Sequence, residues 1–316
     1  MSAGIDMAAI RPTGRLIDSS HQLDNRDHLN RRYEEDGYLF FRGVVSTDAA
    51  ETARLKMAQI LVDQGLIEST SIDAKWIGGD KPGLPEESPL FAGICRALVE
   101  DPGVTRQMER LLGEPVSMVP NVLYRAYRPN NKTGPIHQDG VFNPGAEGYK
   151  SLWIALCDID AQMGGLVLAP GYHRSGSLHD KRTSTIGDGI IAEDAWCSEN
   201  YRQGDVVVIH GFTPHGGLPN RSERIRYSVD TRVQSAANPT VLEGELTRVD
   251  LSAITLKCDD GRLIALTLGE DTLLRFGVNG TPLTRREFLV SGLEGRRIMA
   301  TRDGEVARML RHASSG

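Results

Sequence analysis

Beyond residue 115 the chain consists of short runs in which apolar and polar residues alternate, and Gly, Pro and Asn separate one run from the next. A period of two predicts β-strands with one buried face, and Gly, Pro and Asn indicate the turns between them. Because these strands follow a helical N-terminal part, we expect an antiparallel sandwich or barrel backed by helices. The runs before residue 237 are SMVPNVLYRAYRP, PIHQDGVF, KSLWIALCDI, GGLVLAP, GDVVVIHG and RIRYSVDTRVQ.

The N-terminal part is expected to be helical over residues 22–36, 47–65 and about 90–113. In the second of these helices, Ser46 and Thr47 offer a cap, and apolar residues recur at roughly helical spacing. DGYLFFRGVV, between the first two helices, indicates a turn followed by a strand. Residues 1–21 lack the basic start and apolar stretch of a signal peptide, so we expect a flexible leader.

The strand pattern breaks at Asn238-Pro239 and then restarts. Asp260-Gly261, between two alternating runs, is a strong signal for a β-hairpin. We therefore expect one domain over residues 22–238 and a small all-β domain over residues 239–316. The residues from 240 onward carry 11 Lys and Arg against 11 Asp and Glu, so this second domain has no net charge.

The charge and the cysteines exclude several classes of partner and site. The 316 residues carry a formal charge of −6, which gives no reason to expect nucleic acid or an anionic membrane as partner. No apolar run has the length that crosses a bilayer. The four cysteines are scattered without a C-x-x-C pair, so we expect neither a disulfide scaffold nor structural zinc. The sequence thus predicts a cytoplasmic protein.

His137-Gln138-Asp139 is the most informative motif for chemistry. On a strand, residues i and i+2 point to the same face, so the imidazole of His137 and the carboxylate of Asp139 would project together. A third ligand must come from elsewhere, and His210 and His215 are both candidates. Two histidines and one carboxylate on one face of a metal leave the opposite positions open, as non-haem Fe(II) oxygenases require.

A basic and a hydroxyl side chain on one later strand would complete such a site. Arg224, Arg226 and Ser228 share one face of the run RIRYSVDTRVQ. A buried guanidinium beside a hydroxyl is a suitable receptor for the distal carboxylate of a dicarboxylate, because the planar guanidinium binds it through two hydrogen bonds. Alternation along the strand does not decide between Arg224 and Arg226.

From about residue 30 to 235 the chain resembles the phytanoyl-CoA dioxygenase family of Fe(II)/2-oxoglutarate-dependent oxygenases. The motifs that match are EEDGYLFFRGVVS, HQDG, MGGLVLAPGYHRSG and GDVVVIHGFTPHGGLPNRSERIRYSVD. The resemblance implies a mainly β fold with flanking helices, namely the double-stranded β-helix or cupin-like jelly roll. The residues after 238 lie outside it and only loosely resemble small OB-like barrels.

The resemblance also implies the roles of particular residues. It assigns Arg226 and Ser228 to 2-oxoglutarate, and it favours His215 over His210 as the third ligand. Tyr124 and Trp153 lie on strands next to the metal-bearing one, where they either line the co-substrate pocket or pack in the core. The implied ligands of Fe(II) are His137, Asp139 and His215.

The reaction that the resemblance implies is the hydroxylation of a small-molecule metabolite, with 2-oxoglutarate and O2 converted to succinate and CO2. Halogenation is disfavoured, because halogenating relatives replace the metal carboxylate and Asp139 is present. The same iron chemistry can also lead to desaturation, cyclisation or epimerisation. A second class of function is a catalytically idle jelly roll that binds a ligand or scaffolds a partner. For residues 239–316 we expect a packing or homo-oligomerisation role, since nucleic acid would need a basic face.

Overall fold

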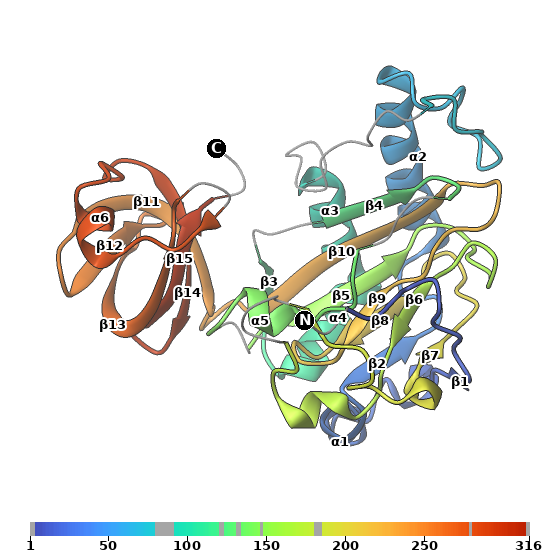
Figure 1. Ribbon diagram of the computed structural model, residues 1–316, viewed down its shortest axis with the longest axis horizontal. Helices are drawn as coiled ribbons and strands as arrows, with labels where there is room; N and C mark the ends of the chain where they lie inside the picture. Colours follow the sequence, from blue (N-terminus) through green and yellow to red (C-terminus); the bar gives the residue numbers. More distant parts are fainter. Residues whose placement is uncertain are drawn as a thin grey trace.

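Figure 1 shows the computed structural model of the chain, in which a β-sandwich with helices on one side is joined to a small β-barrel. No helix in the part of the chain that the structure describes is both long and apolar enough to cross a membrane. The described residues are 4–79, 92–119, 123–130, 134–145, 148–179, 185–277 and 280–313.

The sandwich consists of two sheets. The larger has the strand order β2-β8-β5-β10-β3, with β4 also paired to β10, and the smaller has the order β1-β7-β6-β9. The strands are β1 (Gly14–Arg15), β2 (Tyr38–Phe41), β3 (Val116–Met118), β4 (Leu123–Tyr127), β5 (Lys150–Ala155), β6 (Leu166–Leu168), β7 (Cys197–Ser198), β8 (Val206–Ile209), β9 (His215–Gly217) and β10 (Arg226–Ser235).

Strand β10 is the longest strand of the larger sheet and separates two environments. Tyr227, Val229 and Val233 belong to the hydrophobic cluster that the sheet shares with the N-terminal helices. The intervening side chains face the other sheet, and Arg226 and Arg232 are both buried there. A strand buried on both faces thus carries apolar residues toward the helices and charged residues toward the interior of the sandwich.

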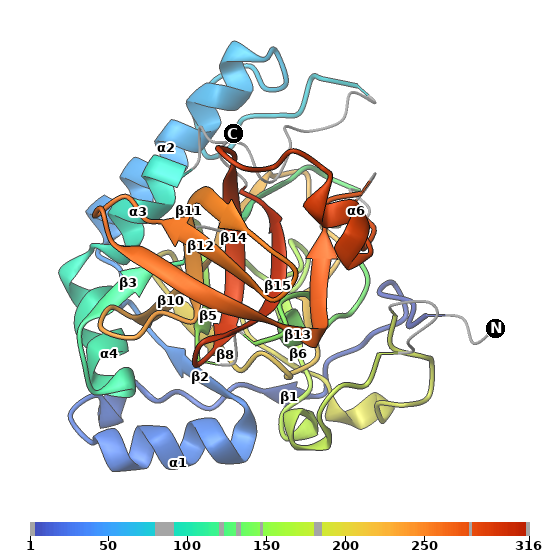
Figure 2. The same ribbon diagram turned by 90° about the vertical axis from the view of Figure 1, so that its left-hand side faces the viewer.

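The N-terminal helices cover one face of the larger sheet (Figure 2). The helix expected over residues 90–113 is two helices, because Pro102 has no backbone N–H to continue the first one. Asp101 caps the second helix by accepting a hydrogen bond from the backbone N–H of Gly103. Among the described residues, these helices are α1 (Arg26–Asp36), α2 (Thr47–Asp63), α3 (Ala92–Val99) and α4 (Pro102–Leu112).

The expectation of a flexible leader over residues 1–21 is wrong for the part that the structure describes, which begins at residue 4. Strand β1 pairs in parallel with β7. Met7, Ile10 and Leu16 are buried, the first two in a cluster with residues of the smaller sheet. The sequence signal was weak because these apolar residues are isolated and gain a partner only in the tertiary structure.

The barrel begins six residues after β10 ends and closes in the order β11-β12-β13-β15-β14. Its interior is a hydrophobic cluster that includes Leu246, Leu256 and Phe288. The expected hairpin is present, and Gly261 in its turn has a φ of 82°, which favours glycine. Its elements are β11 (Val241–Val249), β12 (Ala253–Lys257), β13 (Leu263–Arg275), α6 (Arg285–Leu289), β14 (Arg297–Asp303) and β15 (Val306–His312).

The packing of the N-terminal segment leads to a matched pair of variants. The side chain of Ile10 is 7% exposed and that of Ile17 is 54% exposed. We expect Ile10→Ala to lower the free energy of unfolding by about 2 kcal/mol or more, because it removes buried methylene groups and leaves a cavity. Ile17→Ala should change it by less than about 0.5 kcal/mol. If chemical denaturation showed equally small losses of unfolding free energy for Ile10→Ala and Ile17→Ala, the N-terminal segment would not be part of the core.

Candidate metal centre

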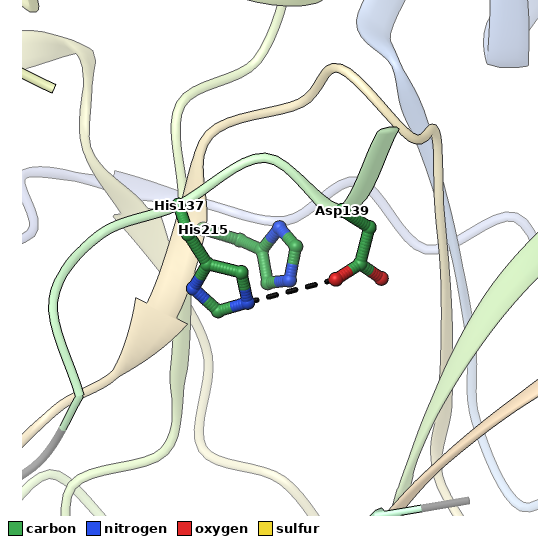
Figure 3. A group of neighbouring side chains, drawn as sticks. All are labelled: His137, Asp139 and His215. Atoms are coloured by element: carbon green, nitrogen blue, oxygen red, sulfur yellow. Dashed lines mark ion pairs between the residues drawn. The ribbon is translucent and has the colours of Figure 1, made fainter. Parts of the chain in front are cut away.

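The side chains of His137, Asp139 and His215 point toward one another (Figure 3). The backbones of His137 and His215 exchange two hydrogen bonds of 3.0 Å, so the two residues lie directly opposite each other, with ring centroids 4.4 Å apart. Nε2 of His137 lies 3.6 Å from Oδ1 of Asp139. One possible ligand atom from each of the three lies within 4.8 Å of the others. This spacing is suited to a single metal ion.

The strand expected at PIHQDGVF is not formed, although its two side chains still meet. Gln138 is extended, and Asp139 is the first residue of the short helix α5 (Asp139–Phe142). The side chain of Gln138 fixes this turn, because its amide nitrogen donates to the carbonyls of Gly176 and Phe212 and its amide oxygen accepts from the N–H of Leu178. The hydrogen bonds of the Gln138 side chain, rather than strand alternation, bring the side chains of His137 and Asp139 together.

The carboxylate of Asp139 is buried and paired. Its Oδ2 accepts a hydrogen bond of 2.6 Å from Ser151 Oγ and one of 3.2 Å from Arg232 Nη2. Burial alone would raise the pKa of Asp139, but the charge of Arg232 and the two imidazoles outweigh it and hold this pKa well below its usual range. Asp139 is therefore an anion at neutral pH, with Oδ1 directed toward the histidines.

The two histidines present the nitrogen that a metal needs. Nδ1 of His215 lies 2.9 Å from the carbonyl of Thr213, and Nδ1 of His137 lies 3.1 Å from the carbonyl of Pro135. A carbonyl can only accept, so each Nδ1 carries a proton, and Nε2 is the nitrogen that remains for a metal when the imidazole is neutral. Burial, together with His137, lowers the pKa of His215 to about 4. His215 is therefore neutral at neutral pH.

His210, the rival third ligand, is placed elsewhere. Its Nδ1 accepts the backbone N–H of Phe212 at 3.1 Å, and its ring packs against the rings of Tyr33 and His173. Burial, and then the charges of His173 and Lys150, lower its pKa to about 4. His210 is thus half-buried among other aromatic rings, and it is His215 that the structure groups with His137 and Asp139.

A cavity of about 60 Å³ adjoins the three side chains and is also lined by Arg226. Arg226 is 1% exposed, and its Nη1 donates a hydrogen bond of 2.8 Å to the carbonyl of Leu218. The ring of Tyr127 lies against its guanidinium, with 4.1 Å from Cζ to the ring centroid. A Cβ at Gly217 would lie 2.7 Å from Arg226 Nη2, so glycine at this position leaves room for the arginine.

The remaining expected co-substrate residues differ in their placement. Ser228 follows Arg226 on the same face of β10, and its buried hydroxyl has no hydrogen-bond partner among the described residues. Trp153 lines the cavity and also packs against the ring of Tyr201. The side chain of Tyr124 lies outside the described part of the chain. Its backbone pairs with Val229.

Arg224, the alternative to Arg226, precedes the first residue of β10 and does not share its geometry. Its Nη2 lies 3.1 Å from Oδ2 of Asp160, and both side chains are exposed. Alternation along the sequence could not distinguish Arg224 from Arg226. In the structure Arg226 is buried on β10 and Arg224 lies on the surface before it.

Sequence reasoning missed Arg232, Ser151, Tyr127 and Gln138. The signal for Arg232 was present, since it continues the i, i+2 series of Arg226 along β10. Tyr127 is paired in register with Arg226, and this cross-strand pairing is set by the tertiary structure. No sequence motif or spacing indicated a role for Ser151 or Gln138.

Comparisons with known proteins identify the family of this chain. The model of the phytanoyl-CoA dioxygenase (PhyH) family matches residues 33–228. The chain is 29% identical over 245 residues to the 1-deoxypentalenic acid 11-beta-hydroxylase of Streptomyces exfoliatus, and this match covers 70% of the chain and 86% of that protein. It is 23% identical over 261 residues to the phytanoyl-CoA dioxygenase domain-containing protein 1 of Mus musculus, covering 66% of the chain and 89% of that protein.

Two solved structures share the fold of the sandwich. The epimerase SnoN in complex with Fe3+, alpha ketoglutarate and nogalamycin RO has a TM-score of 0.53 at 20% identity, covering 67% of this chain and 84% of that one. The alpha ketoglutarate dependent carbocyclase SnoK from nogalamycin biosynthesis has a TM-score of 0.50 at 21% identity, covering 72% and 87%. The expected jelly-roll fold is confirmed.

The two candidate histidines allow a direct test of the ligand set. We expect His215→Ala to abolish tight Fe(II) binding, because it removes one of three neutral or anionic donors from the cluster. His210→Ala should leave Fe(II) binding near the wild-type value, since its ring lies with Tyr33 and His173. Anaerobic Fe(II) titration measures both. Loss of binding in the His210 variant, with retention in the His215 variant, would reverse the assignment.

Proposed function

We propose that this chain, which belongs to the phytanoyl-CoA dioxygenase family, hydroxylates a small-molecule metabolite at a centre formed by His137, Asp139 and His215. The chain is an iron- and 2-oxoglutarate-dependent dioxygenase. When bound, iron, 2-oxoglutarate and O2 together supply the oxidising chemistry, and 2-oxoglutarate leaves as succinate and CO2. The residues of the chain bind, orient and shield these groups.

The observation that carries the assignment is the combination of charges at the end of the cavity. Two imidazoles and one carboxylate lie close enough together to hold one divalent cation, and the carboxylate of Asp139 would bring a negative charge to it. Ser151 and Arg232 occupy Oδ2 of Asp139, so Oδ1 is the oxygen that faces the site. A centre built in this way leaves the opposite side to the co-substrate.

Arg226 and Ser228 are proposed to bind the distal carboxylate of 2-oxoglutarate. Arg226 is buried beside Tyr127 and lines the cavity, and its planar guanidinium can bind a carboxylate through two hydrogen bonds. The buried hydroxyl of Ser228 is a donor for the same carboxylate. Leu152, Leu166 and Ile209 contribute apolar surface to the cavity, which limits the access of water to the reacting groups.

The substrate class follows from the relatives rather than from the cavity. The relative at 29% identity acts on 1-deoxypentalenic acid, and the larger part of each chain is matched. We propose a small metabolite as substrate, a cytoplasmic location and a chain that can assemble into a homo-oligomer.

Epimerisation and cyclisation are the second candidate, because SnoN and SnoK have the same fold. An idle scaffold is disfavoured, since buried charges around an unused site would lower stability.

The first experiment measures turnover without knowledge of the substrate. The purified chain with Fe(II), 2-oxoglutarate and O2 is expected to form succinate slowly, and a chelator or His215→Ala should stop it. Screening candidate metabolites for faster succinate formation, with mass spectrometry of the product, then separates hydroxylation (a gain of one oxygen) from epimerisation or cyclisation. Iron-independent succinate formation, or none with iron bound, would contradict the proposal.

The arginine assignment has a matched control in the same segment. Arg226→Ala should weaken 2-oxoglutarate binding to the Fe(II) protein by about 3–5 kcal/mol, because a carboxylate would be left unpaired in a buried site. This corresponds to a dissociation constant raised on the order of a hundredfold to several thousandfold. Arg226→Lys should recover only part of the affinity. Arg224→Ala should have little effect, as its partner Asp160 is on the surface. Normal binding in Arg226→Ala would remove this residue from the co-substrate site.

A further inference from the structure

The barrel contacts the sandwich at the segment that follows α5 (Figure 1). Arg275 of β13 donates a hydrogen bond of 3.2 Å from Nη1 to the carbonyl of Phe142. Thr301 of β14 donates its hydroxyl to the carbonyl of Pro144. These carbonyls lie three and five residues after Asp139, so the barrel holds the backbone next to a proposed metal ligand.

The same segment touches the barrel through its backbone. Gly145 has a φ of 82°, and a Cβ at this position would overlap the side chain of Arg308 on β15. A Cβ at Gly148 would lie 2.9 Å from Cγ2 of Thr240. Two glycines thus allow the barrel to approach the backbone that carries α5 more closely than other residues would.

A second path leads from the barrel to the side chain of Asp139. Met299 and Met309 of the barrel form one buried cluster with Tyr149, just before β5. The guanidinium of Arg232 lies 6.0 Å from the centroid of the Tyr149 ring and donates to Oδ2 of Asp139. The barrel therefore packs against Tyr149, and Tyr149 lies next to Arg232, which orients the carboxylate of Asp139.

The connection between the two parts is also held by paired hydrogen bonds. The side chain of Gln234, near the end of β10, both donates to the carbonyl and accepts from the N–H of Val241, at 2.9 Å each. Arg302 of β14 donates to the carbonyl of Pro239 at 2.8 Å. The barrel is therefore attached at the strand that carries Arg232 rather than tethered by a free linker.

We infer that the C-terminal barrel is a structural part of the metal centre, in which Thr301 and Met309 act as positioning residues for Asp139. The inference rests on the proposed role of Asp139 as a metal ligand. Metal ligands must be held within about 0.5 Å of their working geometry. The barrel supplies this restraint along the backbone of α5 and through Tyr149 and Arg232. Its role is more specific than the packing or homo-oligomerisation expected from the sequence.

The test compares two threonines of the full-length chain that make the same kind of hydrogen bond. Thr301 donates to a carbonyl of the sandwich, and Thr272 donates to the carbonyl of Ala307 within the barrel. Thr301→Val should weaken Fe(II) binding about three- to tenfold, which corresponds to the loss of one neutral hydrogen bond. Thr272→Val should leave Fe(II) binding unchanged. The measurement is anaerobic titration with Fe(II) alone.

Hydrogen exchange of the metal-free protein gives a readout that does not depend on iron. The N–H of Gly140 donates to the carbonyl of Gly211 at 2.8 Å, so its exchange rate reports how firmly α5 is held. We expect faster exchange in the peptide covering residues 136–145 for Thr301→Val, and wild-type exchange there for Thr272→Val.

A second pair of variants covers the path through Tyr149. Met309 and its neighbour Leu310 on β15 are both fully buried, but Met309 packs in the cluster with Tyr149 and Leu310 packs inside the barrel. Met309→Ala should weaken Fe(II) binding, and Leu310→Ala should not, although both lower the melting temperature.

Wild-type Fe(II) affinity and wild-type exchange over residues 136–145 in both Thr301→Val and Met309→Ala would overturn the inference. Equal loss in these variants and in the Thr272→Val and Leu310→Ala controls would also overturn it, because the effect would then be general destabilisation. Failure of the proposed metal site is distinguishable, since His215→Ala would then bind Fe(II) as tightly as the wild type.

Discussion

The ion pair between Asp139 and Arg232 is the interaction on which the rest of the centre depends. Both side chains are buried, and Nη2 of the arginine lies 3.2 Å from Oδ2 of the carboxylate. Two charges removed from water are stable only when they are paired and their remaining hydrogen-bonding atoms are occupied. Ser151 completes the pairing on Oδ2. The other carboxylate oxygen of Asp139, Oδ1, lies beside the imidazoles of His137 and His215.

Strand β10 connects this pair to the other end of the cavity. Arg226 and Arg232 lie six residues apart on the same face, a distance of roughly 20 Å along an extended strand. The guanidinium of Arg232 pairs with the carboxylate of Asp139, and that of Arg226 is the group proposed to bind the distal carboxylate of the co-substrate. The opposite face of the strand is apolar and packs against the helices, which makes the spacing of the two arginines rigid.

The barrel, which lies outside the matched family region, also restrains the position of Asp139. The matched family region ends at residue 228, so Arg232 and all of β11 to β15 lie outside it. The two parts nevertheless pack closely. Gly145 of the sandwich lies against the barrel, and Met299 and Met309 of the barrel pack against Tyr149 of the sandwich. Close packing of this kind transmits displacement between the parts because interiors have few voids and low compressibility.

The amino-acid sequence by itself determined the strand-rich class, the barrel after Pro239 and the identity of His137, Asp139 and Arg226 as candidates, because periodicity and motif spacing are local properties. The tertiary structure decided what depends on contacts between distant segments. It opened a helix at Asp139 where a strand was expected, because the side chain of Gln138 bonds to residues far along the chain. It buried the N-terminal segment, grouped His215 rather than His210 with His137 and Asp139, and placed Arg232 against the carboxylate of Asp139 and the barrel against the segment that follows it. Burial and pairing of charge are set by neighbours in space, and the order of residues does not record them.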